Sequence, residues 1–281
     1  MKMLRPKFLV TVLAALLVAV AAEARQMRVL AIGNSFSMDA VEQYLWQLAA
    51  EQGDTLIIGN AYIGGCSIDR HLNSLLDDLP DYQYNKVVDG VKTTRDSVDL
   101  TTIIADEQWD IISLQQASPY SGKPESYGNL WMLRVLVSEQ ANNPEVKLIW
   151  HLTWAYAADF KGGQFAGYGY DQKRMYHDIL TTYFSTVRPE GFDRYVPVGI
   201  AVQNARARVG EQLNRDGLHL SIPFGRYVAA CTWCEFLTGK SVVGLKYAPS
   251  GINVADVKAA QLAAHEAILA TFWPTDRLLA Q

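Results

Sequence analysis

The chain has 281 residues, of which 49% are hydrophobic, and a formal net charge of −4 at pH 7. This acidic balance excludes a protein that binds nucleic acid through a basic surface, and three cysteines are too few for a disulfide framework. No linker rich in Pro, Gly or Ser and no internal repeat divides the sequence, so we expect one large hydrophobic core.

The N-terminal segment has the pattern of a secretory signal peptide. Three basic residues precede an apolar run from Phe8 to Ala22, and a small-x-small triplet ends at Ala24. A membrane anchor is the alternative, but a run of about 15 residues is shorter than the roughly 20 that a spanning helix needs. We therefore interpret residues 1–24 as a signal peptide and residues 25–281 as a single domain, exported to the periplasm or the medium. Cleavage changes the formal net charge from −4 to −6.

Beyond the signal segment, the sequence alternates short apolar runs with stretches whose apolar residues recur at helical spacing. The apolar runs predict strands at Met27–Ile32, Thr55–Ile58, Trp109–Leu114, Val146–Trp150 and Tyr195–Ile200. The helical spacing predicts helices at Asp39–Gln52, Ile68–Leu79, Tyr127–Gln140, Tyr176–Phe184, Ile222–Leu237 and Val254–Phe272. Apolar strands separated by amphipathic helices imply an α/β fold, a three-layer sandwich with a central parallel sheet of about five strands covered on both faces.

A small hairpin interrupts this alternation. Asp89 and Gly90 lie between two short runs, Tyr84–Val88 and Val91–Arg95, and this pair favours a two-residue turn. We expect the hairpin to be an insertion that decorates the main sheet.

The cysteines indicate neither redox chemistry nor a metal site. Cys231 and Cys234 lie in Arg226–Leu237, which is apolar at helical spacing, so both thiols are expected to be buried structural groups. A zinc site would need two more ligands nearby in the sequence, and we predict no metal. The role of Cys66, which follows Gly65, stays open.

The first predicted strand leads into a serine-containing turn, Gly33–Ser37. In a parallel α/β sheet, ligands bind beyond the carboxyl ends of the strands, so the fold would deliver Ser35 to that crevice. Gly33 permits a tight turn. The serine is a candidate nucleophile, although a helix cap is the commoner role for a serine at such a turn.

A candidate base lies near the other end of the chain. Asp216 precedes His219 by three residues, and in a loop this spacing lets the carboxylate reach Nδ1 while Nε2 faces a nucleophile. A plain turn that begins with Asp216 is the alternative. Three other histidines, His71, His177 and His265, lie in predicted helices, where solvated or packed imidazoles are ordinary.

Together the two motifs resemble those of the SGNH hydrolases, the GDSL-type lipases and esterases. The opening block of that family is Gly-Asp-Ser-x-Ser, and this chain has Gly33-Asn34-Ser35-Phe36-Ser37, with Asn in place of Asp. The closing block is Asp-x-x-His, matched by Asp216 and His219. The resemblance implies a flavodoxin-like three-layer fold and a catalytic triad of Ser35, His219 and Asp216.

The resemblance also implies an oxyanion hole. Its first donor is the N–H of Ser35, and Asn60–Gly65 resembles the block that supplies the second, for which we choose Gly65 over Gly64. The third donor in the family is an Asn of a Gly-x-Asn-Asp block, which is missing here. The chain has Gln115 and Gln116 after the third parallel strand, and either amide would replace that Asn; alternatively both amides bind loop backbone.

The run from His151 to Tyr156 follows the fourth parallel strand, so Trp154 and Tyr156 are candidates to stack on a substrate, with packing in the core as the alternative. We predict a secreted serine esterase that needs no cofactor and hydrolyses a carboxylic ester, such as an O-acetyl group on an extracellular carbohydrate, through an acyl-enzyme. Neither nucleic acid nor, after cleavage, a membrane is an expected partner, and the oligomeric state stays open. A carbohydrate-binding protein without turnover is the alternative, because one oxyanion block is missing. A phosphate-ester hydrolase lacks both a metal cluster and a phosphate cradle.

Overall fold

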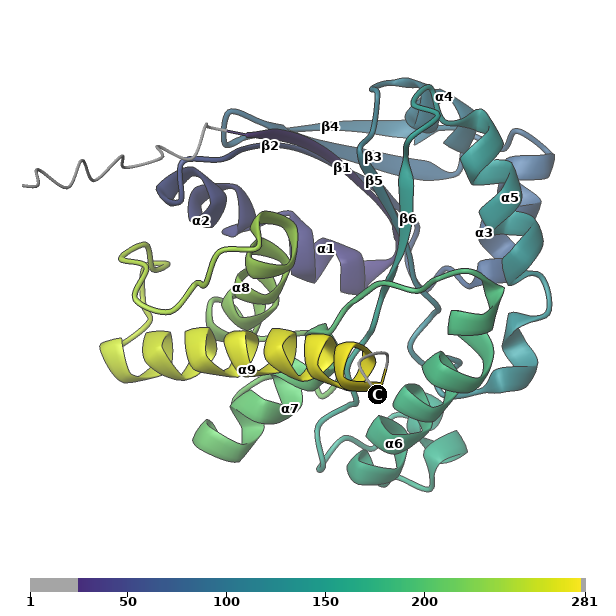
Figure 1. Ribbon diagram of the computed structural model, residues 1–281. Helices are drawn as coiled ribbons and strands as arrows, with labels where there is room; N and C mark the ends of the chain where they lie inside the picture. Colours follow the sequence, from purple (N-terminus) through teal and green to yellow (C-terminus); the bar gives the residue numbers. More distant parts are fainter. Residues whose placement is uncertain (1–24, 279–281) are drawn as a thin grey trace, which may run out of the picture.

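The computed structural model describes residues 25–278 of the chain, with the side chains of residues 25–271 (Figure 1). The segment that the sequence predicts to be a signal peptide, residues 1–24, lies outside the described residues. In the part of the chain that the structure describes, no helix combines the length and the apolar character needed to cross a membrane.

The described residues form one seven-stranded sheet. Its strands are β1 (Gln26–Gly33), β2 (Thr55–Tyr62), β3 (Tyr82–Val88), β4 (Val91–Val98), β5 (Ile111–Leu114), β6 (Lys147–His151) and β7 (Tyr195–Val196). Their order is β4-β3-β2-β1-β5-β6-β7. The five strands from β2 to β7 in this order are parallel, as the sequence predicts.

Helices cover both faces of the sheet. The longer helices are α1 (Ser35–Val41), α2 (Leu45–Glu51), α3 (Ile68–Leu76), α4 (Leu100–Ala105), α5 (Leu130–Gln140), α6 (Gln172–Thr182), α7 (Val198–Val209), α8 (Phe224–Thr238) and α9 (Val254–Leu278). Shorter helical turns are η1 (Pro124–Tyr127), η2 (Gly163–Tyr168), η3 (Tyr183–Val187) and η4 (Arg188–Glu190). Helices α1, α2, α7, α8 and α9 form one outer layer, and α3, α4 and α5 form the other (Figure 1). The predicted three-layer α/β fold is confirmed.

The hairpin belongs to the sheet instead of merely decorating it. Asp89 and Gly90 form its turn with positive φ angles of 51° and 75°, as a two-residue turn between twisted strands requires. Strand β3 pairs antiparallel with β2, so the hairpin extends the five parallel strands to seven at one edge.

Several predicted boundaries are off by a few residues, and two elements differ more deeply. The helix expected at Asp39–Gln52 is two helices, because Tyr44 has a φ of 67°, a conformation that an α-helix cannot contain. The strand expected at Tyr195–Ile200 ends at Val196, and α7 begins after Pro197. Proline has no N–H for the sheet ladder, and the short apolar run around it fits a buried helix as well as a strand.

Helix α8 is buried along almost its entire length, with α7, α9, α1 and α2 as neighbours. Cys231 and Cys234 lie in its interior as free thiols, as predicted. Burial raises the pKa of the Cys234 thiol to about 12 and that of the Cys231 thiol well above its ordinary value. Because the thiolate is the reactive form, both thiols are inert structural groups.

The parallel arrangement gathers the loops that carry the predicted site. Strands β1, β2, β5 and β6 end at Gly33, Tyr62, Leu114 and His151. The carboxyl ends of parallel strands meet at one edge of the sheet, where α/β proteins bind their ligands. The turns that follow these four strands therefore share that edge.

Candidate active site

The turn between β1 and α1 presents Ser35 at the first position of the helix. Asn34 is the N-cap, and its Oδ1 accepts a hydrogen bond of 3.0 Å from the N–H of Phe36. Gly33 lets the backbone of the turn lie close to Ser37 and Gln115, because a Cβ at this position would be 2.7 Å from Ser37 Oγ and 2.9 Å from the Gln115 side chain. The cap and the glycine fix the backbone on both sides of Ser35, which stays partly exposed.

The structure brings Ser35, His219 and Asp216 together. His219 Nε2 lies 2.9 Å from Ser35 Oγ, and His219 Nδ1 lies 2.6 Å from Asp216 Oδ2. Partial burial works to raise the pKa of Asp216, but hydrogen bonds from the ring and backbone N–H of His219 and the backbone N–H of Leu218 outweigh it and lower that pKa below its usual range. An ionised carboxylate only accepts hydrogen bonds, so Nδ1 is the donor to Asp216, and in the neutral ring Nε2 accepts the hydroxyl hydrogen of Ser35.

The loop that carries His219 is anchored to α1 by a buried carboxylate. Asp39 is fully buried, and its two oxygens accept hydrogen bonds of 3.1 Å from Arg215 Nη1. Arg226 Nη2 pairs with Oδ1, and the N–H of Leu220 donates to Oδ2 at 2.8 Å. Because Asp39 is four residues after Ser35, both side chains lie on one face of the helix. This cluster, which the sequence analysis missed, joins α1 to residues on both sides of the Asp216–His219 pair.

The loop after β2 approaches the same turn. Asn34 Nδ2 donates a hydrogen bond of 3.0 Å to the carbonyl oxygen of Cys66, directly after Gly65. Gly65 is exposed and has a φ of 62°, which only glycine adopts without strain. Burial raises the pKa of the Cys66 thiol to about 12, so this sulfur packs the loop and offers no thiolate.

The two glutamines have different partners. Gln115 Nε2 donates to Asn34 Oδ1 at 2.8 Å, and Gln116 Nε2 donates to both the carbonyl and the hydroxyl oxygen of Ser126, at 3.0 and 3.2 Å. Gln116 Oε1 accepts from the N–H of Ile68 at 3.1 Å. The amide nitrogen of Gln116 therefore binds the loop after β5, the arrangement that the sequence left open as the alternative to an oxyanion donor.

A buried histidine completes the support of Asn34. His151 Nδ1 lies 2.7 Å from Gln115 Oε1, and since an amide oxygen only accepts hydrogen bonds, Nδ1 is the donor. Burial lowers the pKa of His151 to about 3, so the ring is neutral. The series His151, Gln115, Asn34 thus orients the residue next to Ser35 from inside the protein.

Trp154 and Tyr156 do not fit the predicted role in substrate stacking. Both side chains are completely buried. Trp154 is stacked on Phe36 with ring centroids 3.9 Å apart, and its Nε1 donates to the carbonyl oxygen of Leu218 at 2.8 Å. The Tyr156 hydroxyl lies 2.8 Å from Ser118 Oγ. Both aromatic residues pack beneath the edge of the sheet that carries Ser35, and no face of either ring is open to a ligand.

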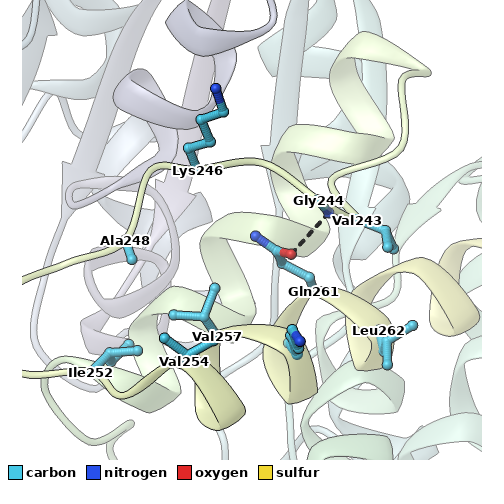
Figure 2. Close-up of a pocket in the computed structure, with 10 residues that line it drawn as sticks. Val243, Gly244, Lys246, Ala248, Ile252, Val254, Val257, Gln261 and Leu262 are labelled. Atoms are coloured by element: carbon cyan, nitrogen blue, oxygen red, sulfur yellow. Dashed lines mark hydrogen bonds between the residues drawn. The ribbon is translucent and has the colours of Figure 1, made fainter.

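Two of the hollows in the described residues are relevant to ligands. An open groove of about 600 Å³ lies between the loop after β5 and η2, with Tyr120 and Gln164 on its walls. A mostly apolar pocket of about 430 Å³ lies between residues 243–252 and the first turns of α9, and Figure 2 shows Val254, Val257 and Leu262 along it. None of the predicted site residues lines either hollow. Across the described residues, no three His, Cys, Asp or Glu side chains are grouped to hold a metal ion.

Comparisons with known proteins place the chain in a family. The model of the family described as "Domain of unknown function (DUF4886)" matches residues 28–267. A DUF4886 family protein from Bacteroides uniformis has a similar crystal structure, with a TM-score of 0.85 and 46% identity over 87% of this chain and 95% of that chain.

The chain is also similar, at lower sequence identity, to solved structures of SGNH and GDSL-like proteins. A candidate SGNH hydrolase from Slackia heliotrinireducens gives a TM-score of 0.50 at 19% identity, over 75% of this chain and 99% of that chain. A candidate GDSL-like lipase from Parabacteroides merdae gives 0.48 at 14% identity, over 76% and 96%. No curated protein matches the chain. The predicted resemblance is confirmed at the level of the fold: the chain belongs to the DUF4886 family and has the SGNH hydrolase fold.

Proposed function

We propose that the protein is an exported serine esterase, in which Ser35 is the nucleophile, His219 the general base and Asp216 the group that orients His219. The observation that carries the proposal is the unbroken series of short contacts, 2.9 Å from Ser35 Oγ to His219 Nε2 and 2.6 Å from His219 Nδ1 to Asp216 Oδ2. A nucleophile within hydrogen-bond reach of a base that a third group orients is the arrangement that acyl transfer requires.

In this mechanism Ser35 Oγ attacks the carbonyl carbon of an ester while His219 Nε2 takes its proton. The imidazolium, stabilised by Asp216, then protonates the leaving alcohol and leaves an acyl-enzyme on Ser35. Water repeats the sequence, with His219 as its base, and releases the acid. No step requires a cofactor or a metal ion.

The negative charge of the tetrahedral intermediate needs hydrogen-bond donors. We assign this role to the backbone N–H groups of Ser35 and Gly65. The N–H of Ser35 is in the first turn of α1, where N–H groups have no partner within the helix, and the Asn34–Cys66 bond ties the Gly65 loop to that turn. Gln115 would act by holding Asn34, and Gln116 by holding the loop after β5, instead of as a third donor.

The proposed substrate is an O-acetyl group or a similar small acyl ester on a carbohydrate outside the cytoplasm. Its support is the signal-like pattern of residues 1–24 and the absence of a basic composition that would suit nucleic acid. The partly exposed Ser35 at an open edge of the sheet is accessible to such a group on a larger molecule.

The first experiment measures hydrolysis of p-nitrophenyl acetate by the purified protein, by Ser35→Ala and by a control, Ser185→Ala, whose serine is exposed on η3. We expect turnover by the wild type and the control and a loss on the order of a thousandfold or more in Ser35→Ala. A fluorophosphonate should add one adduct to the wild-type mass and none to Ser35→Ala. Folded wild-type protein that neither turns over the ester nor reacts would contradict the proposal and favour a binding protein on the same fold.

A further inference from the structure

The open groove between the loop after β5 and η2 is tied to both halves of the triad. On one wall, Ser126 accepts hydrogen bonding from the amide nitrogen of Gln116. The neighbouring Gln115 holds Asn34 beside Ser35. On the other wall, Gln164 lies next to Phe165, whose ring is stacked with Phe160.

Phe160 in turn packs against the Asp216–His219 loop. A Cβ on Gly217 would come within 2.2 Å of the Phe160 ring, and the N–H of Ala157 donates to the Gly217 carbonyl oxygen at 2.7 Å. No triad residue lines the groove. Its walls belong to the loops after β5 and β6, which leave the sheet at the same edge as the turn that carries Ser35.

The two walls are joined to each other by preformed contacts. Lys123 Nζ donates to the carbonyl oxygen of Gly167 at 2.7 Å and lies 4.8 Å from the centre of the Tyr168 ring. The N–H of Gly122 donates to the Tyr168 hydroxyl at 2.9 Å, and that hydroxyl donates to the carbonyl oxygen of Pro119 at 3.2 Å. The groove is therefore held open in a fixed shape, and a ligand does not have to order it.

The lining combines one flat apolar surface with groups that form hydrogen bonds. The Tyr120 side chain is 48% exposed, and Pro119 lies beside it. Glu125 and Gln164 are exposed and add a carboxylate and an amide to the walls. A long acyl chain would contact the apolar part of the lining but would leave these polar groups without partners, which costs free energy. A sugar ring, with an apolar C–H face and hydroxyl groups at its rim, satisfies both kinds of group.

We propose that this groove is the subsite for the alcohol part of the substrate, and that it binds sugar rings with Tyr120 as the stacking platform and Glu125 and Gln164 as partners for hydroxyl groups. This inference rests on the proposed function, since it takes Ser35 to be the reacting group. The volume of about 600 Å³ lies within the range of roughly 300–1,000 Å³ that is usual for ligand sites. The groove then selects carbohydrate esters over simple ones without contributing to the chemical step.

The test compares a substrate that fills the groove with one that does not. Hydrolysis of partially acetylated xylo-oligosaccharides and of p-nitrophenyl acetate is measured for the wild type, Tyr120→Ala, Tyr120→Phe and a control, Trp131→Ala, which removes an exposed aromatic ring on α5 outside the groove. Calorimetry with the unacetylated oligosaccharides measures binding without turnover.

We expect Tyr120→Ala to raise KM for the oligosaccharide esters and to weaken oligosaccharide binding by about tenfold, as loss of one good aromatic contact does. Its kcat/KM on p-nitrophenyl acetate should stay within about twofold of the wild type. Tyr120→Phe should bind the oligosaccharides as the wild type does, because it keeps the ring. Trp131→Ala should change the hydrolysis of neither substrate.

The experiment distinguishes a failure of the sugar subsite from a failure of the proposed esterase. Equal losses on both substrates in Tyr120→Ala, or hydrolysis of p-nitrophenyl acetate by a wild type that neither cleaves nor binds oligosaccharides, would overturn the sugar subsite and leave the esterase intact. Oligosaccharide binding that depends on Tyr120, in a protein that hydrolyses no ester, would support the groove and overturn the esterase.

Discussion

Asp216 controls both the tautomer and the direction of the His219 ring. Its Oδ2 accepts a hydrogen bond from the N–H at Nδ1, while Oδ1 accepts hydrogen bonds from the backbone N–H groups of Leu218 and His219 at 3.1 and 2.8 Å. With both oxygens engaged, the carboxylate has one orientation, and the ring that it holds directs Nε2 at Ser35.

The variant Asp216→Asn should separate this role from simple packing. The amide has nearly the same size but can turn its NH₂ group to Nδ1, which moves the ring proton to Nε2 and removes the base. On p-nitrophenyl acetate we expect kcat to fall by about 10²–10⁴ with a small change in KM. Asp193→Asn, at an exposed carboxylate, is the control. An unchanged kcat in a folded Asp216→Asn protein would show that Asp216 does not orient the base.

Three hydrogen-bond partners explain why this chain has Asn34 at the position where related motifs have Asp. Its Oδ1 accepts from Phe36 and Gln115, and its Nδ2 donates to the carbonyl oxygen of Cys66. Only an amide provides both the acceptor and the donor that this buried position requires.

Asn34→Asp should therefore damage this protein, although it restores the commoner motif. A carboxylate would place an oxygen 3.0 Å from the Cys66 carbonyl without a hydrogen between them, in a site that is 2% exposed. We expect the free energy of unfolding to fall by about 1–3 kcal/mol and kcat on p-nitrophenyl acetate to fall by about tenfold or more because the Gly65 loop moves. Urea unfolding and steady-state kinetics measure the two effects. Wild-type values for both would show that the Asn34–Cys66 bond has no role.

The packing of α1 against the His219 loop depends on one buried cluster of charges. The Asp39 carboxylate forms ion pairs with Arg215 and Arg226, which precede and follow the Asp216–His219 pair in the chain. The N–H of Arg215 also donates to the carbonyl oxygen of His219 at 2.9 Å, which closes the loop on itself. The distance between Ser35 Oγ and His219 Nε2 therefore depends on the contact between α1, near the start of the chain, and the His219 loop, near its end.

Asp39→Asn tests this coupling between the two elements. Without the charge, two arginines lose their common partner and the loop shifts relative to α1. A displacement of about 1 Å in a catalytic group costs about a hundredfold in rate, so we expect kcat to fall about tenfold to a hundredfold well below the melting temperature. Asp54→Asn breaks the ion pair of another buried carboxylate, with Lys240 at 2.8 Å, and serves as the control for lost stability. If both variants lose the same fraction of kcat, Asp39 is structural only.

The sequence predicts those elements whose local signal is unambiguous. Asp89–Gly90 fixes the hairpin turn, and the buried runs of β1 and β5 show as continuous apolar segments because both faces of the sheet are covered. The break at Tyr44 is not visible, since a tyrosine in the left-handed region has no sequence signature and depends on packing, here an edge contact with Tyr227. Helix α4, at Leu100–Ala105, is too short for a periodic pattern to show.

For the site, the sequence predicts local pairs and leaves long-range partners open. Asp216 and His219 are three residues apart, and their contact follows from that spacing. Whether Trp154 faces a ligand or the core depends on Phe36, and whether Gln116 is a free donor depends on Ser126. Such choices are made by the whole tertiary structure, in which residues far apart in sequence compete for the same polar and aromatic surfaces.

Two buried histidines should make the entire molecule sensitive to acid. Burial lowers the pKa of His71 to about 3, with the Arg70 charge adding to the effect, and burial alone lowers that of His151 to about 3. An unfolded histidine has a pKa of about 6.5, so between the two values the unfolded chain binds more protons and stability falls as the pH falls.

Each buried histidine should cost about 2 kcal/mol of unfolding free energy between about pH 6.5 and pH 5, and this loss is measurable by urea unfolding. His71→Gln can keep a hydrogen bond to the Tyr82 hydroxyl, which lies 2.8 Å from His71 Nδ1, but it has no proton to gain, so its stability should depend less steeply on pH. His177→Gln, at a side chain of α6 that is 79% exposed, is the matched control for the loss of one histidine. A slope in His71→Gln equal to that of the wild type would mean that His71 is protonated in the folded protein, and that its buried contact with Tyr82 opens to water as the pH falls.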